Sequence, residues 1–373
     1  MTPGRPGPTC GRGSWRADRS YLDRHRYELA HAVAARYAGV PRVPGSVALT
    51  RAAWLPDAPI DLGDARLAWD DAPAPAAVTG TEPASAAVRA AEPGDAPYPT
   101  YAGVLAALAP PRLLEDRFTY RLLAAPDITR LTYGPGTYLD GLNVGEAVAH
   151  ETAAAVRAGR DPVTAPLPLR DAVGDPTDPR RRPMTTALTV LTLRHDRAAG
   201  TMSFPLHHRE AAAVAHGGGL VQVAPVGVFQ PSAKGPATRR GDLDLWRCAV
   251  REYAEELLGT PEDYPEPFDY DRWPPYRALT GARADGRLRA YLLGIAVDPL
   301  TLATDLLTVT VIDAGTHDRV FAGAVRANPE GTLTGHVPFT PASVRDLLAT
   351  ARLQPAAAAV LATADRHRRR LTR

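Results

Sequence analysis

The sequence predicts an α/β fold for the second half of the chain, with a smaller α+β domain before it. From residue 184 onward, apolar and partly β-branched runs of strand length alternate with segments whose apolar residues recur at helical spacing. Glycine and proline separate these segments, as they do where a chain turns between strands and helices. This order of elements predicts a mixed sheet packed against helices.

The length of 373 residues leaves room for two domains, because one compact domain of this size would be unusual. Residues 1–20 are rich in glycine, proline and arginine and show no periodicity, which predicts a disordered tail. Three prolines and three consecutive arginines within 171–183 mark a boundary. We therefore expect an N-terminal α+β domain over 21–178 and a second domain over 184–373.

The composition is that of an ordinary globular protein, with 45% hydrophobic and 23% charged residues. A formal net charge of +2 gives no overall electrostatic reason to expect nucleic-acid binding. No apolar run approaches the roughly 18 residues of a membrane span, and the N-terminus lacks the apolar core of a secretory signal. Cys10 and Cys248 lie far apart, so no disulfide scaffold is expected. These features predict a cytoplasmic protein that does not enter a membrane.

The N-terminal half mixes helical and β-like segments. Residues 71–96 are rich in alanine and proline and predict an exposed loop. The other segments predict a helix at 21–37, short strands at 46–49 and 65–69, a helix at 98–108, strands at 118–123 and 128–133, and a helix at 143–158.

The C-terminal half alternates more regularly between strands and helices. Residues 186–193 and 201–206 show the period of two that is typical of strands, and a turn joins them. The last helix begins at Thr340, a hydroxyl cap, with Pro341 at the first helical position. Further strands are predicted at 220–229, 290–297, 306–312, 320–325 and 333–338.

One helix of this half, predicted over 242–259, carries a cluster of carboxylates. Glu252, Glu255 and Glu256 lie on one arc of the helix, apart from its apolar side. Like charges repel on a helix, so a helix usually spreads or pairs them. Converging carboxylates are also what a divalent cation such as Mg²⁺ requires. The apolar side consists of Trp246, Ala249, Val250, Tyr253 and Leu257.

This helix resembles the helical half of the Nudix hydrolase box. Arg251 matches the arginine of that motif, and Glu252, Glu255 and Glu256 match its three metal-binding glutamates. Gly227, in the apolar strand before the helix, matches the glycine whose backbone carbonyl contributes to the metal site. The resemblance implies that these five residues form a catalytic site for Mg²⁺ or Mn²⁺.

The resemblance covers residues 184–355 and implies a Nudix-like α/β/α sandwich with a mixed sheet. It implies that the protein hydrolyses a nucleoside diphosphate linked to another group. We expect the N-terminal half to shape access to the site, to recognise the distal group of the substrate or to mediate dimerisation.

The loop half of the motif departs from the family pattern. Gly227 lies 24 residues before Arg251, further than in the motif, so that 230–240 corresponds to an insertion. The loop glutamate of the motif falls on Leu243, and its final glycine falls on Leu258. Other carboxylates would then have to activate the water. The candidates are Asp242, Asp244 and Glu330.

A narrower resemblance links several segments to actinobacterial proteins that are labelled as helix-turn-helix transcriptional regulators. The start of the chain contains only one clear helix before its β-like region, so DNA binding is not supported by this chain alone. The segments that carry this resemblance are 118–122, 143–151, 206–209, 216–219, 225–232 and 244–259.

Two further interpretations therefore stand beside the hydrolase. The first is a non-catalytic sensor that uses the same pocket to bind a nucleotide-like ligand and a partner regulator. The altered loop half favours this sensor, whereas the three glutamates favour the hydrolase. The second is a solvated acidic helix face, balanced by Arg247 and Arg251, on an unrelated fold.

Two other patterns are weaker. His207, His208 and His216 do not have the spacing of a zinc site and have no cysteine nearby. The pair His150 and Glu151 resembles the start of a zincin helix, but alanine stands where the second histidine is required. Neither pattern predicts a metal site.

Overall fold

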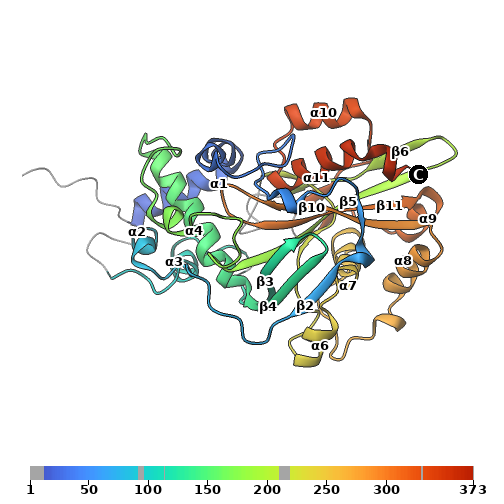
Figure 1. Cartoon of the computed structure of the whole chain (residues 1–373), viewed down its shortest axis with the longest axis horizontal. Coiled ribbons are helices and arrows are strands. Elements are labelled where there is room, and N and C mark those ends of the chain that lie inside the picture. The colour runs from blue at the N-terminus through green and yellow to red at the C-terminus, as the bar shows by residue number, and fades with distance from the viewer. Residues whose placement is uncertain (1–11, 91–95, 113, 210–218, 329–330, 373) are drawn as a thin grey trace, which may run out of the picture.

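The computed structural model describes residues 12–90, 96–112, 114–209, 219–328 and 331–372 (Figure 1). Within this part of the chain, the main sheet has ten strands, and seven of them follow the order β1-β10-β11-β5-β3-β4-β2. These strands are β1 (Ile60–Asp61), β2 (Arg66–Trp69), β3 (Phe118–Asp127), β4 (Arg130–Thr137), β5 (Met184–Asp196), β10 (Leu288–Val297) and β11 (Thr304–Asp313). The other three are β6 (Thr201–Phe204), β9 (Val226–Val228) and β14 (Val337–Pro338).

The sheet is mixed, as the sequence predicts. β11 runs parallel to β5 over ten residue pairs, and β2 runs parallel to β4, while the other pairings are antiparallel. A smaller sheet with the order β12-β13-β7-β8 lies beside it. Its strands are β7 (Leu206–Arg209), β8 (Val221–Val223), β12 (Ala327–Asn328) and β13 (Gly331–Leu333).

Helices cover both faces of the main sheet (Figure 1). On β5, Leu188 and Val190 belong to the core under α7 (Leu245–Glu252) and α8 (Pro274–Ala284). Leu191 and Leu193 belong to the core under α10 (Pro341–Thr350) and α11 (Pro355–Arg366). Because successive strand residues point to opposite faces, the near-continuous burial of β5 shows that both of its faces are covered. The predicted α/β fold with a mixed sheet between helices is confirmed.

The remaining helices lie mostly in the N-terminal half and at the ends of the sheet. They are α1 (Arg12–Ala34), α2 (Ala86–Arg89), α3 (Tyr101–Leu108), α4 (Tyr138–Arg157), α5 (Pro168–Val173), α6 (Pro236–Gly241), α9 (Ala314–Val320) and α12 (Arg368–Leu371). None of the described helices combines the length and the apolar character that crossing a bilayer requires.

The predicted disordered tail over 1–20 is wrong for residues 12–20, which form the first turns of α1. Trp15 is fully buried, and its indole N–H donates to the carbonyl oxygen of Val88 at 2.8 Å. Its ring also lies against His150 of α4, with 4.6 Å between ring centroids. The arginine- and glycine-rich composition does not indicate a helix, because helix formation here depends on the contacts of Trp15 with distant residues. Residues 1–11 lie outside the described part.

The main sheet contains strands from both sides of the predicted domain boundary. β3, from the N-terminal half, pairs with β5 through Arg121–Thr185 and Leu122–Met184. β1 likewise pairs with β10. Strands from the two predicted domains, 21–178 and 184–373, therefore share one sheet. The division of the chain into these two domains stays a prediction.

Two segments differ from their predicted structure. The described part of the predicted loop 71–96 includes the short helix α2, in which Val88 is buried. The predicted strand 320–325 is instead the end of α9 followed by a turn. In both cases the local residue pattern was overruled by packing: Phe321, for example, is buried against Tyr253 of the site described below.

Removing the Trp15 side chain tests whether α1 is anchored as observed. Trp15→Ala should lower the free energy of unfolding by about 3–5 kcal/mol, because a large buried aromatic side chain is lost. Arg24→Ala, an exposed change on the same helix, is the control and should cost less than about 0.5 kcal/mol. Equal unfolding midpoints in urea for the two variants would contradict this packing.

Candidate functional site

The carboxylate-bearing helix consists of α7 and a π-helical turn, Tyr253–Leu257, that continues it. Asp244 caps α7 by accepting hydrogen bonds from the backbone N–H groups of Trp246 and Arg247. In the turn, the hydroxyl group of Tyr253 lies 2.8 Å from that of Thr192 on the sheet. π-Helical turns occur frequently at functional sites. The turn departs from the regular helical spacing assumed for this segment, which changes how its glutamates are directed.

The carboxylate of Glu252 is the most unusual group of the site. Only 7% of the residue is exposed, and no described residue forms a hydrogen bond or an ion pair with its side chain. Gly227 of β9 lies directly against it: a Cβ atom at Gly227 would be 1.7 Å from Glu252 Cδ. Burial raises the pKa of Glu252 well above its ordinary value, and the negative charges of Glu255 and Glu256 raise it further. The structure thus brings together Gly227 and Glu252, which the sequence had placed in one site.

Glu255, in the π-helical turn, is partly buried and has one hydrogen-bond donor. The hydroxyl group of Tyr264 donates to its Oε1 at 2.6 Å. Burial raises the pKa of Glu255 to about 7, with a further contribution from the negative charge of Glu262. A glutamate in this range exchanges its proton near neutral pH, as groups in functional sites often do.

Glu256 has a different neighbourhood. It is buried, and its Oε2 lies 3.7 Å from Nδ1 of the fully buried His207 on β7. The three glutamates thus do not share one set of contacts. Among the described residues, no three histidine, cysteine, aspartate or glutamate side chains are arranged to hold a metal ion by themselves.

Arg251 forms no ion pair with the three glutamates, although its positive charge lowers the pKa of Glu252. Its guanidinium group is buried and donates to the carbonyl oxygen of Gln230 and the hydroxyl group of Tyr270. It also lies 3.5 Å from the carboxylate of Asp242. These partners come from the two segments 230–242 and 259–273. Arg251 therefore joins these segments to α7.

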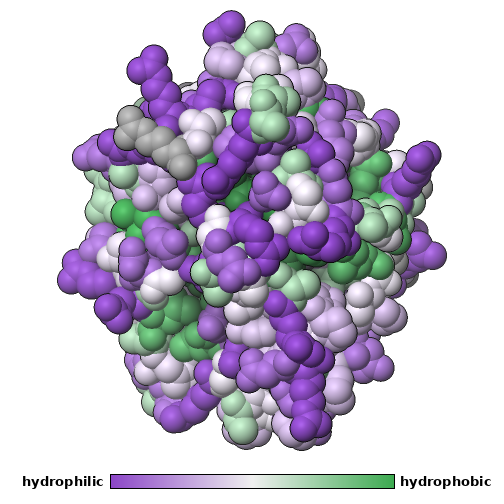
Figure 2. Space-filling view, turned by 90° about the vertical axis from the view of Figure 1, so that its right-hand side faces the viewer, coloured by the Kyte–Doolittle hydropathy of each residue, from purple (hydrophilic) through white to green (hydrophobic). Residues whose placement is uncertain are grey.

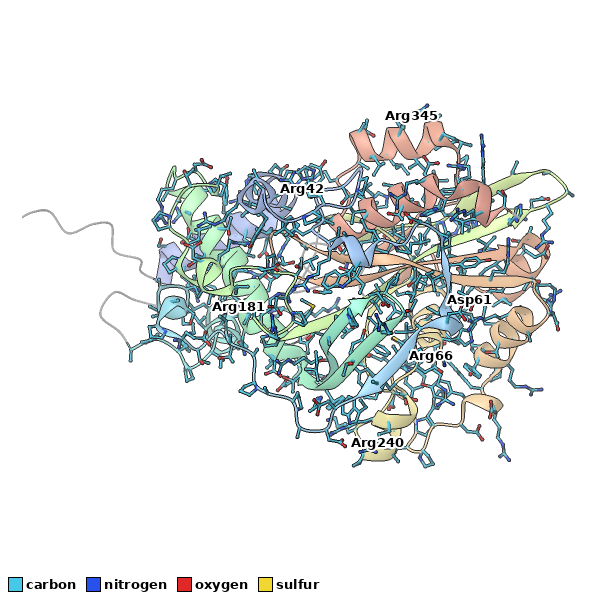
Figure 3. The ribbon with its side chains drawn as sticks, in the orientation of Figure 1. Arg42, Asp61, Arg66, Arg181, Arg240 and Arg345 are labelled. Carbon is cyan, nitrogen blue, oxygen red and sulfur yellow. The ribbon has the colours of Figure 1, made fainter. Side chains whose placement is uncertain are left out.

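The two segments contact each other, and the second contacts Glu255 through Tyr264. Glu262 accepts a hydrogen bond from the side chain of Gln230 at 2.7 Å and pairs with Arg117 at the start of the β3 region. The inserted segment extends to Arg240, labelled in Figure 3, which pairs with Asp71 at 2.6 Å. An aromatic cluster within the second segment and the start of α8 adds to this packing. Its members are Tyr264, Phe268, Tyr270, Trp273 and Tyr276.

Two of the three candidates for a catalytic base have structural roles. Asp244 caps α7, as described above. Asp242 is buried and accepts the backbone N–H of Ser232 at 2.7 Å beside Arg251. Glu330 lies outside the described residues.

The sequence did not single out Tyr264, Tyr270, Glu262 or Arg117. The five aromatic residues between positions 264 and 276 were the available signal, because they are dense for a chain with 6% aromatic residues. The structure also gives the positions of residues from the two weaker histidine patterns of the sequence. His208 is exposed, His216 lies outside the described part, and Glu151 accepts backbone N–H groups from Leu169 and Arg170 at the start of α5.

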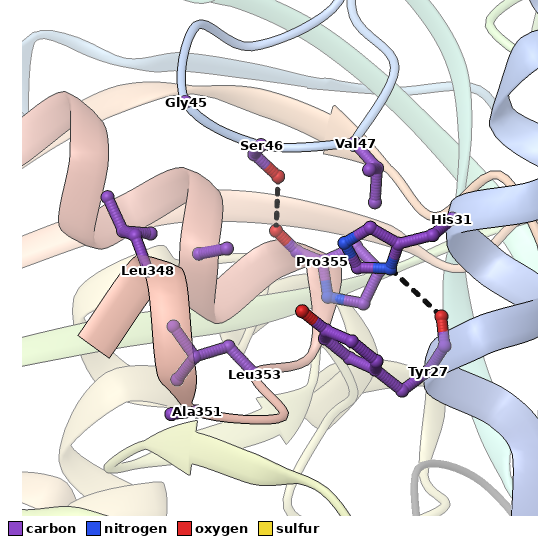
Figure 4. Close-up of a pocket in the computed structure, with 10 residues that line it drawn as sticks. Tyr27, His31, Gly45, Ser46, Val47, Leu348, Ala351, Leu353 and Pro355 are labelled. Atoms are coloured by element: carbon purple, nitrogen blue, oxygen red, sulfur yellow. Dashed lines mark hydrogen bonds between the residues drawn. The ribbon is translucent and has the colours of Figure 1, made fainter. Parts of the chain in front are cut away.

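A cavity of about 330 Å³ lies on the opposite face of the sheet, between α1, residues 45–47 and the α10–α11 pair (Figure 4). Its lining is mainly apolar, and two of its polar side chains bond to carbonyl groups of other lining residues. Ser46 donates to the carbonyl oxygen of Pro355 at 3.0 Å, and His31 Nδ1 lies 2.9 Å from the carbonyl oxygen of Tyr27. The buried carboxylates are a stronger indication of chemistry than this cavity.

Comparison with known proteins adds no relative: no family model matches this chain, and no curated protein matches it.

A side chain at Gly227 should displace Glu252. Gly227→Ala places a Cβ atom within the volume of the Glu252 carboxyl group, so we expect a loss of about 1–3 kcal/mol of stability, as for other overpacked sites. Gly39→Ala is the control, because nothing lies within 4 Å of a Cβ atom there. Chemical denaturation of both variants measures the difference. Equal stability would show that Gly227 and Glu252 are not in contact.

The raised pKa of Glu255 predicts a pH-dependent stability. The folded state holds this proton more tightly than the unfolded state, so the contribution is fully present below about pH 4.5 and is lost as the pH rises through about 7. Glu255→Gln should therefore melt at a higher temperature than the wild type at pH 8 in the absence of divalent cations, with a smaller difference at pH 5. A difference that grows toward pH 5 would contradict this sign.

Proposed function

We propose that this chain is a Mg²⁺-dependent hydrolase of the Nudix type that acts on a nucleoside diphosphate linked to another group. The observation that carries the proposal is the carboxylate of Glu252, which is buried against Gly227 without a partner among the described residues. The match of Arg251, Glu252, Glu255 and Glu256 to the Nudix helix supports it.

The carboxylates fit a divalent cation for an electrostatic reason. A buried carboxylate without a partner is either protonated or neutralised by a cation, because a buried isolated charge is costly. Mg²⁺ is usually held by one or two carboxylates together with waters and substrate phosphates. Glu252 and Glu255 suit such a site, and three converging side chains are not needed.

Each residue then has a distinct role. A bound cation would neutralise the charge of a diphosphate and activate a water molecule. Glu252 and Glu255 would hold this cation as carboxylates, and Glu255, whose pKa without a cation is about 7, would release its proton when the cation binds. Arg251 would position the segments 230–242 and 259–273. Glu256 beside His207 would support the site from the second sheet.

A second function is a sensor that binds a nucleotide-like ligand without turnover. Arg251 favours it, because this residue holds both covering segments through Gln230 and Tyr270. A site that remains covered in this way would retain a ligand but would limit the release of products.

Calorimetric titration with Mg²⁺ or Mn²⁺ tests the cation site. The wild type should bind one or more ions at pH 8, and Glu252→Gln and Glu255→Gln should each weaken the binding at least tenfold, because a carboxylate ligand is lost. Glu28→Gln, the same chemical change at an exposed helical position, should bind like the wild type. No binding by the wild type would refute the proposal.

Turnover separates the two functions. A panel of nucleoside diphosphates linked to sugars, nucleotides or alcohols is assayed for released nucleotide or phosphate. Hydrolysis that requires Mg²⁺ and is lost in Glu255→Gln supports the hydrolase. Binding of a panel member without hydrolysis supports the sensor.

A further inference from the structure

The rings of two histidines outside the candidate site lie beside each other. One of them belongs to α9, which lies on the side of the molecule that faces the viewer in Figure 2. His317 belongs to α9 and is 5% exposed, whereas His336 lies in the exposed connection between β13 and β14. Their ring centroids are 5.1 Å apart, and their planes make an angle of 70°. The sequence did not single out either residue.

The separation of the two rings fits a shared metal ion. A Zn–N bond is about 2.0–2.1 Å long, and a ring centroid lies about 1.1 Å behind its nitrogen atom. Two imidazoles on one tetrahedral ion therefore have centroids about 5 Å apart. The observed 5.1 Å agrees with this distance.

A carboxylate holds one of the two rings in the orientation that metal ligation needs. Oδ1 of Asp318 lies 3.1 Å from Nδ1 of His317. Arg194 fixes this carboxylate through two hydrogen bonds of 2.7 and 2.6 Å. In metal sites, a carboxylate on one ring nitrogen fixes the tautomer and leaves the other nitrogen for the ion. Nε2 of His317 is thus the nitrogen available to a ligand. His336 forms no hydrogen bond with a described residue.

We propose that His317 and His336 form a binding site for a divalent transition-metal ion that prefers imidazole ligands, such as Zn²⁺ or Cu²⁺. The remaining coordination positions are filled by water, because the described residues provide no third metal ligand of this kind. Burial lowers the pKa of both imidazoles, which keeps them in the neutral form that binds metals. This site uses none of the three glutamates and does not rest on the hydrolase proposal.

The test uses the full-length protein without a histidine tag. Zn²⁺ is titrated calorimetrically in a large excess of Mg²⁺, which occupies oxygen ligands. The wild type should bind one Zn²⁺ ion that His336→Ala binds at least tenfold more weakly. His336 is in an exposed connection, so its loss should leave the fold intact. His208→Ala, an exposed histidine elsewhere, is the matched control and should bind like the wild type.

A second measurement identifies the ligand atoms. The electron paramagnetic resonance spectrum of bound Cu²⁺ should show coupling to two imidazole nitrogens, reduced to one in His336→Ala and in His317→Gln. Asp318→Asn should retain both couplings and weaken Zn²⁺ binding about 10- to 100-fold, as expected for an outer partner of a ligand. Equal Zn²⁺ affinity in His336→Ala and the wild type, or a spectrum without nitrogen coupling, would overturn the proposal.

Discussion

The burial of carboxylates at the end of α7 is the constraint that organises the candidate site. Glu252 is 7% exposed, and the charges of two neighbouring glutamates oppose its ionisation. Leaving such a group charged and unpaired costs several kcal/mol, so its neighbours determine whether it holds a proton or a cation. The ionised form of Glu252 is therefore electrostatically unfavourable, as is common for ionisable groups in functional sites.

The rest of the fold holds these carboxylates in place. Tyr253 ties the π-helical turn to the sheet, since its hydroxyl group lies within hydrogen-bonding distance of Thr192 on β5 and Thr310 on β11. Gly227 provides the close approach that a side chain would prevent. Arg251 fixes the two covering segments. The N-terminal half contributes through Arg117, which pairs with Glu262, so this half is part of the surroundings of the site.

The sequence allowed the α/β class, the mixed sheet and the proximity of Gly227 to Glu252 to be predicted, because apolar periodicity and a local motif determine them. It could not reveal the partners of Arg251, which depend on how the segment 230–242 and the aromatic segment fold back. The π-helical turn was also missed, because a regular helical period was assumed. Helix α1 was missed at its start, where Trp15 gains its stability from residues more than 70 positions away. Local sequence patterns thus predicted which segments form helices and strands. The contacts between these helices and strands depend on long-range packing.

The central claim is that Glu252 and Glu255, beside Gly227, hold a divalent cation. The most direct test is a crystal structure of the protein grown with Mn²⁺, using anomalous scattering to locate the ion. The account predicts an anomalous peak in contact with the Glu252 carboxylate and beside Gly227. A structure in which Glu252 remains buried without a peak, at a Mn²⁺ concentration that saturates binding in solution, would contradict it.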